Sequence, residues 1–151
     1  TLTQASVQSL FIEMRFSGQT LSTGTGFVVQ GANNPLLITN RHNVTGRHQE
    51  TNEPLSATCG IPNEIVISHH LKNRLGQWIS VTEPILNDSG NPLWHEHPKL
   101  GAKADFVALP LTEGLNHIQL YPFNLDQTGL SGQQVLWHQN LILITTTSQC
   151  S

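Results

Sequence analysis

The sequence predicts an all-β protein, folded as a small antiparallel barrel or sandwich. Apolar residues recur with a period of two in several short runs, and no stretch sustains the 3.6-residue period of a helix face. Glycine, proline and asparagine separate these runs, as turn residues do between the strands of all-β folds. Together these observations favour about six or seven short strands.

The first strand is predicted over residues 10–16, where apolar and polar residues alternate. Its buried side would carry Leu10, Ile12, Met14 and Phe16. Further strands are expected at residues 24–30, 35–39, 64–68, 77–81, 105–109 and 118–121. One helical turn is expected at residues 41–46, and residues 86–103 have the composition of a long loop.

Length and charge limit the classes of partner. A chain of 151 residues with 37% hydrophobic residues is about one domain and can bury a core. Its net charge is -3 and its seven lysines and arginines are scattered, so we expect neither nucleic acid nor a membrane surface as partner. The apolar run at residues 141–144 is far too short to span a bilayer. The compartment cannot be inferred from this composition.

Cysteines and histidines do not predict a metal site. Cys59 and Cys150 could form at most one disulfide, and their spacing matches no metal motif. Among eight histidines, the pairs His69-His70 and His95-Glu96-His97 are closest to a ligand pattern. Zinc needs three or four convergent ligands, and the sequence does not bring these pairs together. We interpret them as loop and surface histidines, with no metal.

Three segments carry the pattern of a catalytic site. The apolar strand from Leu37 ends at a turn that holds His42, and Asp105 opens a second apolar strand 63 residues later. A glycine-rich segment, Gly24-Thr25-Gly26-Phe27, precedes both. Histidine can accept and return a proton near neutral pH, and a carboxylate on its other ring nitrogen orients it.

In this order, the three segments resemble the first half of a trypsin-like (chymotrypsin-fold) serine peptidase. Asn43 occupies the place where animal relatives carry a cysteine, so the pattern looks more like bacterial members. The resemblance implies a six-stranded antiparallel β-barrel over residues 5–128, the first barrel of the double-barrel fold. It also implies His42 as general base, Asp105 as its orienting partner, a peptide or protein substrate, and no cofactor.

The nucleophile is the part of the family pattern that the spacing disfavours. Gly129-Leu130-Ser131-Gly132 matches the family's Gly-x-Ser-Gly, which makes Ser131 a candidate nucleophile. Most of a second barrel should precede that serine and would need about 40–60 residues, whereas 25 separate it from Asp105. We therefore interpret residues 129–132 as a turn, within a divergent tail at 129–151 that truncation, rearrangement or frameshift produced.

Three functional interpretations stay open from the sequence. The chain could be an incomplete serine endopeptidase that is inactive alone, or a non-enzymatic pseudopeptidase barrel that binds a peptide or protein. A third interpretation is that a separately encoded second barrel completes the site. A first barrel separated from its partner should expose the apolar surface that the partner normally covers.

Overall fold

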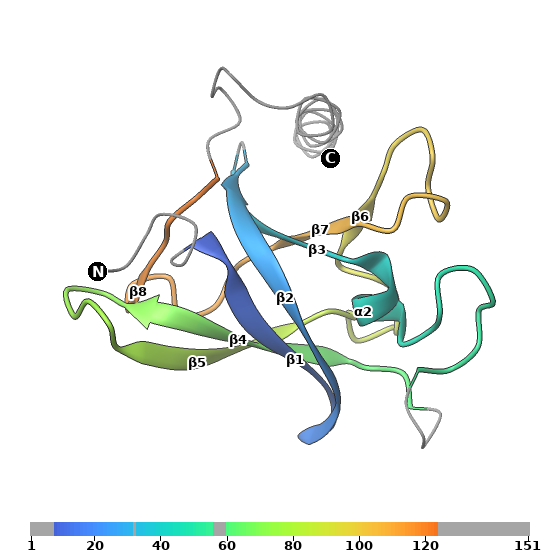
Figure 1. The fold of residues 1–151 in the computed structure, drawn as a ribbon, viewed down its shortest axis with the longest axis horizontal. Helices are drawn as coiled ribbons and strands as arrows, with labels where there is room; N and C mark the ends of the chain where they lie inside the picture. The colour runs from blue at the N-terminus through green and yellow to red at the C-terminus, as the bar shows by residue number, and fades with distance from the viewer. Residues whose placement is uncertain (1–7, 32, 56–59, 124–151) are drawn as a thin grey trace.

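The computed structural model describes residues 8–31, 33–55 and 60–123, which form an antiparallel β-sheet and one short helix (Figure 1). In chain order the elements are β1 Leu10–Phe16, β2 Gln19–Gln30, β3 Pro35–Thr39, α2 Arg41–Thr45, β4 Glu64–Leu71, β5 Trp78–Pro84, β6 His95–Glu96, β7 Val107–Pro110 and β8 Ile118–Gln119. The all-β class predicted from the period-two pattern is therefore confirmed. In the described part of the chain, no helix is long and apolar enough to cross a membrane.

The strands pair in the order β5-β4-β1-β2-β3-β7-β6, and β8 pairs with β4 beside this path. Every ladder between named strands is antiparallel. The pairing of β3 with β7 places Thr39 opposite Val107, so the chain just after β3 lies near the chain just before β7. Within residues 8–31, 33–55 and 60–123 the sheet is open, because no ladder joins β5 to β7.

Side-chain contacts span the gap between β5 and the end of β7. The carboxylate of Glu83 on β5 accepts hydrogen bonds from the backbone N–H groups of Thr112 (2.9 Å) and Glu113 (2.8 Å). It also accepts a bond from the Thr112 hydroxyl at 3.1 Å. Thr112 and Glu113 lie just after the end of β7 at Pro110, so Glu83 joins β5 to the segment that follows a strand with which β5 shares no ladder.

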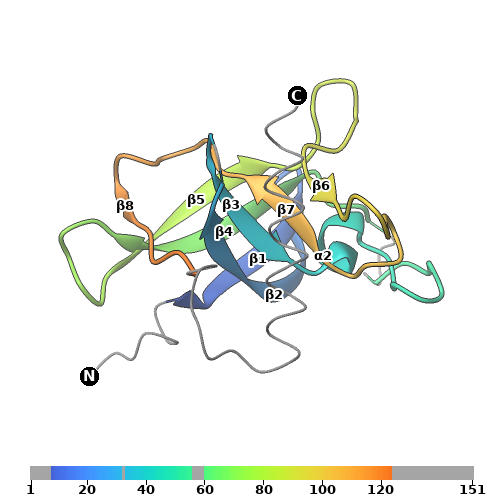
Figure 2. The same ribbon diagram turned by 90° about the horizontal axis from the view of Figure 1, so that it is seen from above.

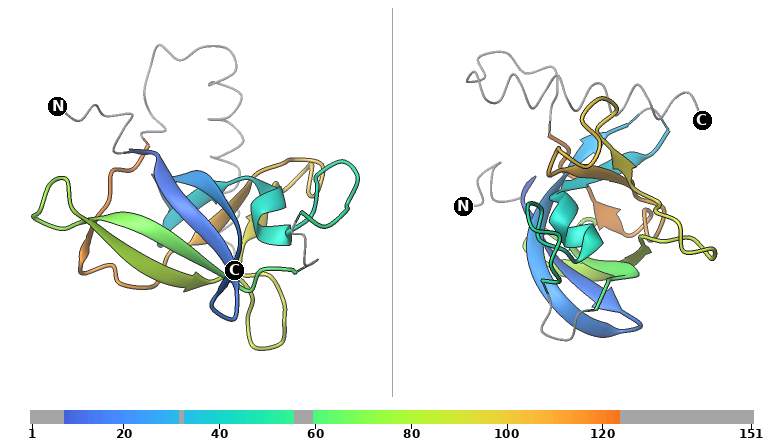
Figure 3. Two further views of the ribbon diagram at one scale, coloured as in Figure 1. Left: turned by 60° about the horizontal axis from the view of Figure 1, so that its bottom comes forward. Right: turned by 90° about the vertical axis from the view of Figure 1, so that its right-hand side faces the viewer.

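The sheet curls strongly (Figures 2 and 3), and residues from several of its strands form one main core cluster. Alternate residues of the longer strands point into it, as Leu10, Ile12 and Met14 do on β1 and Ile65 and Ile67 do on β4. Its buried members are Leu10, Ile12, Met14, Val28, Leu37, Val44, Ile65, Ile67, Ile85, Val107, Leu109 and Leu111. Strands that are far apart in the pairing order meet in this one cluster, so the sheet wraps around it.

A second apolar cluster comes from β2, β3 and the approach to β7. Its buried members are Val29, Leu36, Ile38, Ala104, Phe106 and Ala108. Phe27 and Phe123 pack against it, with ring centroids 5.7 Å apart. Ala104 and Phe106 are the chain neighbours of Asp105, so this cluster fixes the backbone that carries Asp105.

The first hairpin corrects one sequence prediction. Ser17 and Gly18 have φ of 48° and 87°, so a tight turn joins β1 directly to β2, which begins earlier than the predicted residue 24. Phe16, predicted to be buried, is 52% exposed. The prediction was wrong because Phe16 lies at the end of β1 beside the hairpin turn, where β1 still pairs with β2 but its ladder with β4 has already ended at Arg15.

Other boundaries differ modestly from the prediction. β3 has the predicted bounds, whereas β4 continues to Leu71 and so includes His69 and His70. The predicted loop at 86–103 contains the short strand β6, which pairs with β7. Asp105 precedes β7 instead of opening it. The predicted domain boundary after residue 128, the tail at 129–151 and both cysteines lie outside the described residues.

Candidate catalytic site

His42 lies in a single helical turn that follows β3 immediately. The turn, α2, ends at Gly46, whose φ of 69° is left-handed and whose N–H donates to the His42 carbonyl at 3.1 Å. A Cβ at Gly46 would lie 2.8 Å from the Pro62 ring, so this position needs glycine both for its backbone conformation and for space. The predicted helical turn at 41–46 is confirmed.

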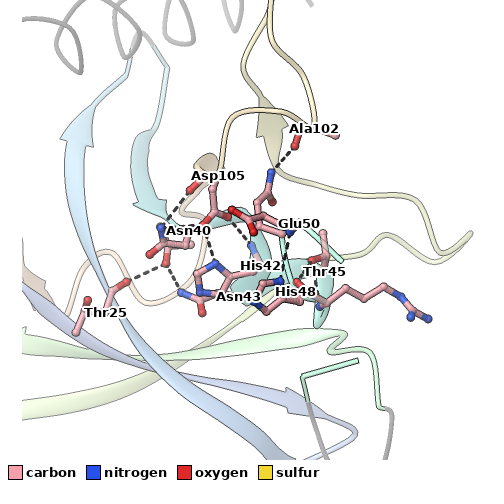
Figure 4. Close-up of polar contacts among 12 residues, drawn as sticks. Thr25, Asn40, His42, Asn43, Thr45, His48, Glu50, Ala102 and Asp105 are labelled. Atoms are coloured by element: carbon pink, nitrogen blue, oxygen red, sulfur yellow. Dashed lines mark hydrogen bonds and ion pairs between the residues drawn. The ribbon is translucent and has the colours of Figure 1, made fainter. Parts of the chain in front are cut away.

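Asp105 contacts His42 through both of its carboxylate oxygens (Figure 4). His42 Nδ1 lies 2.8 Å from Asp105 Oδ2, and the backbone N–H of His42 donates to Asp105 Oδ1 at 3.0 Å. The two residues are 63 positions apart in sequence and meet because β3 pairs with β7. The structure thus brings together the two residues that the sequence analysis named as base and orienting acid.

This geometry suits a general base. When Nδ1 carries the proton and donates it to Asp105, Nε2 keeps its lone pair and can accept a proton from a substrate or nucleophile. The side chains of His42 and Asp105 are 34% and 31% exposed, so solvent reaches the pair and its ionic attraction adds at most about 1 kcal/mol to stability. The value of the contact is orientation more than stability.

A buried polar relay holds the histidine turn against β2. Asn43 Nδ2 donates to Thr39 Oγ1 at 2.9 Å, and the Thr39 hydroxyl donates to the carbonyl of Thr25 at 2.9 Å. A Cβ at Gly24 would lie 2.9 Å from Asn43 Nδ2, so glycine in this strand leaves room for the asparagine. This contact is a physical reason for the glycine-rich segment beneath His42.

Two further contacts surround the pair and were missed by the sequence analysis. Asn40 Nδ2 donates to the backbone carbonyl of Asp105 at 3.1 Å and lies 3.4 Å from its Oδ2. Arg41 Nε donates to Glu96 Oε1 at 2.9 Å, which ties α2 to β6. The available signal was that Asn40 and Arg41 directly precede His42 in the sequence. No sequence motif predicts that their partners are Asp105 and Glu96.

Three histidines contradict the prediction of loop and surface positions. His69, His70 and His97 are buried, with exposed fractions of 1%, 3% and 4%. His97 Nδ1 accepts backbone N–H bonds from the 97–101 turn, at 3.0 and 3.1 Å. Among the described residues, no three histidine, cysteine or acidic side chains gather as metal ligands.

Two titratable side chains are buried in the sheet, His69 on β4 and Glu83 on β5. The sequence predicted burial for neither. Burial, and secondarily the neighbouring His70, lowers the pKa of His69 to about 4. Neither ring nitrogen of His69 has a hydrogen-bond partner in the described structure. Burial raises the pKa of Glu83, while its bonds to Thr112 and Glu113 lower it in part.

The candidate nucleophile Ser131 lies outside the described residues, as does Cys150. Comparison with protein-family models, with curated proteins and with solved structures finds no match to this chain. An inference about function therefore depends on the chemistry and geometry of His42 and Asp105.

Proposed function

We propose that this chain carries the base-bearing barrel of a trypsin-like serine endopeptidase, with His42 as general base and Asp105 as its orienting partner. The observation that supports this function is the double contact of the Asp105 carboxylate with the ring and backbone nitrogens of His42. Such a contact selects one imidazole tautomer and stabilises the imidazolium that forms during acyl transfer.

The reaction is hydrolysis of a peptide bond. A serine Oγ attacks the carbonyl carbon while its proton passes to Nε2 of His42, and Asp105 stabilises the resulting imidazolium. The imidazolium then returns the proton to the departing amine, and the carbon–nitrogen bond breaks. Water, deprotonated by the same nitrogen, releases the acyl group and regenerates the serine. These proton transfers require no cofactor.

The proposed domain is a six-stranded barrel made of β5, β4, β1, β2, β3 and β7. Five of its six seams are ladders in the observed pairing order. The sixth, between β5 and β7, is bridged by the Glu83 carboxylate through Thr112 and Glu113. In the proposed barrel, this buried carboxylate with its three donors takes the place of main-chain pairing at the sixth seam.

A second barrel, distinct from the described residues, would supply the serine and the oxyanion hole. The loops beside α2 expose Leu55, Ile61 and Leu100, at 41%, 46% and 50%. The Leu55 N–H donates to the carbonyl of Gly46 at the end of α2, and Gln49 joins this loop to Ala102. Apolar side chains exposed beside the base favour a protein surface as the missing partner. Alone, the chain is expected to be inactive.

A fluorophosphonate probe with intact-mass readout tests the location of the nucleophile. The purified chain should remain unlabelled, as should its Ser131→Ala variant. Labelling that is lost in Ser131→Ala would show that the nucleophile is Ser131, and would overturn the second-barrel part of the proposal.

The base itself is tested in a longer protein. Coding sequence downstream of the chain, read in all three frames, should contain further strand patterns and a Gly-x-Ser-Gly. A protein in which this downstream segment is fused to the chain should be labelled by the fluorophosphonate probe. His42→Gln should abolish the labelling, and Asp105→Asn should reduce the labelling rate roughly 10⁴-fold. The exposed His48 is the matched control, and His48→Gln should keep the wild-type rate. Absence of such sequence, or equal labelling of His42→Gln, would favour the pseudopeptidase instead.

A further inference from the structure

The side chain of Asn40 reaches Asp105 from the junction between β3 and α2 (Figure 4). We propose that Asn40 is a positioning residue that holds the Asp105 carboxylate against His42 before any nucleophile is supplied. This inference rests on the proposed function, because it assigns Asn40 a role in orienting the general base.

One amide group contacts two parts of Asp105. Asn40 Nδ2 donates to the backbone carbonyl of Asp105 at 3.1 Å and lies 3.4 Å from Oδ2, the same oxygen that faces His42 Nδ1. The shorter bond anchors the backbone of Asp105, and the longer contact keeps an N–H near its carboxylate. Rotation of the carboxylate away from His42 would lose this contact and the two bonds to His42.

The amide is directed to Asp105 instead of to its own helix. Asn40 is the N-cap residue of α2, with extended backbone at φ −68° and ψ 142°. Asparagine at this position usually accepts a bond from the first turn, but the described structure has no such side-chain cap. A side chain that forgoes its ordinary local bond and makes a contact across 65 positions of sequence points to a tertiary role.

Asp105 needs an additional constraint of this kind. It precedes β7, so no strand ladder holds it, and its side chain is 31% exposed. Its buried neighbours Ala104 and Phe106 fix the path of the backbone but not the side-chain rotamer. Water competes for an exposed carboxylate, and the Asn40 amide favours the rotamer that faces the histidine.

NMR of the purified chain tests this role without requiring activity. The readouts are the tautomer of neutral His42 and the exchange rate of its Nδ1 proton with solvent. Removal of the donor in Asn40→Ala should accelerate this exchange about three- to tenfold, which is within the range for the net contribution of an ordinary hydrogen bond. Asn40→Leu keeps the side-chain volume but not the donor, and should accelerate exchange equally. Both variants should keep wild-type circular dichroism, because Asn40 is exposed.

Gln49 provides the matched control. Its Nε2 donates to the carbonyl of Ala102 at 2.5 Å, so Gln49→Ala removes an amide bond to the same loop without touching Asp105. In Gln49→Ala, the exchange rate of the His42 Nδ1 proton should stay within twofold of the wild-type rate. The positioning role would be overturned if the His42 Nδ1 proton exchanged no faster in the two Asn40 variants than in Gln49→Ala. It would also be overturned if exchange in Asn40→Leu stayed at the wild-type rate, because leucine has no donor. A wild-type His42 without a proton on Nδ1 would instead overturn the His42–Asp105 pairing and the proposed function with it.

Discussion

Acidification probes the buried imidazole of His69. This residue lies on β4 opposite Ile79 and is 1% exposed, and neither ring nitrogen has a hydrogen-bond partner in the described structure. Burial, followed by the proximity of His70, lowers its pKa from 6.5 to about 4. The folded state therefore holds His69 neutral in a pH range where the unfolded chain protonates it.

The sign and size follow from proton linkage. Between pH 6.5 and about 4 the unfolded state binds more protons at His69, so this part of the stability is present above pH 6.5 and is lost as pH falls. The difference in pKa corresponds to about 3 kcal/mol at 1.36 kcal/mol per pKa unit. From about pH 7.5 to about pH 4.5, His69 should lower the unfolding free energy by about 2 to 3 kcal/mol.

Urea unfolding followed by circular dichroism across this pH range measures the effect. Glu83 contributes with the opposite sign, because burial raises its pKa and acidification then favours the folded state. Glu83 is present in both wild type and His69→Leu, so the difference between the two proteins cancels its contribution. In His69→Leu, the unfolding free energy should no longer show the loss of about 2 to 3 kcal/mol between about pH 7.5 and about pH 4.5. His117→Gln, at an exposed position, should keep it. An equal pH dependence in wild type and His69→Leu would refute the reasoning.

Three further predictions concern the core and the histidine turn. Ile12→Ala should lower the free energy of unfolding in urea by about 2–5 kcal/mol, because Ile12 is fully buried. Phe11→Ala, at the 47% exposed neighbouring position, should lower it by well under half as much. Equal losses in the two variants would contradict the assigned faces of β1. Thr39→Val should lower stability by about 1–3 kcal/mol, since it leaves the buried Asn43 amide without its acceptor; an unchanged thermal midpoint would exclude the relay. Gly24→Ala should cost about 1–3 kcal/mol, because its Cβ would lie 2.9 Å from Asn43 Nδ2, and pairing it with Asn43→Ala should recover part of that loss if the clash is the cause.

Local pattern was sufficient for much of the secondary structure. Residues 35–39 form a strand with the predicted bounds, because proline can begin a strand and the apolar run ends at Asn40. The helical turn after it was likewise predicted, with glycine at its end. By contrast, β4 runs three residues past its predicted end, where the pattern changes to histidine but pairing with β5 continues.

The candidate site was predictable in its residues but not in its contacts. His42 and Asp105 were chosen through resemblance to a family, and the 2.8 Å contact between them depends on the ladder between β3 and β7. Nothing in the sequence pattern distinguishes Asn40 from an ordinary cap residue before a helical turn. Its amide turns to Asp105 only because the fold brings that loop within reach.

The sequence by itself determined the approximate place of most of the longer strands, since alternation and turn residues act over a few neighbouring positions, whereas β6 forms in a predicted loop only because β7 pairs with it. Only the tertiary structure decided which faces of those strands are buried at their ends. Phe16 is exposed because the ladder between β1 and β4 ends at Arg15, and pairing with β5 and β8 encloses His69 and His70 in spite of their polarity. Burial depends on strands distant in the chain, and no local pattern of polarity encodes where those strands will lie.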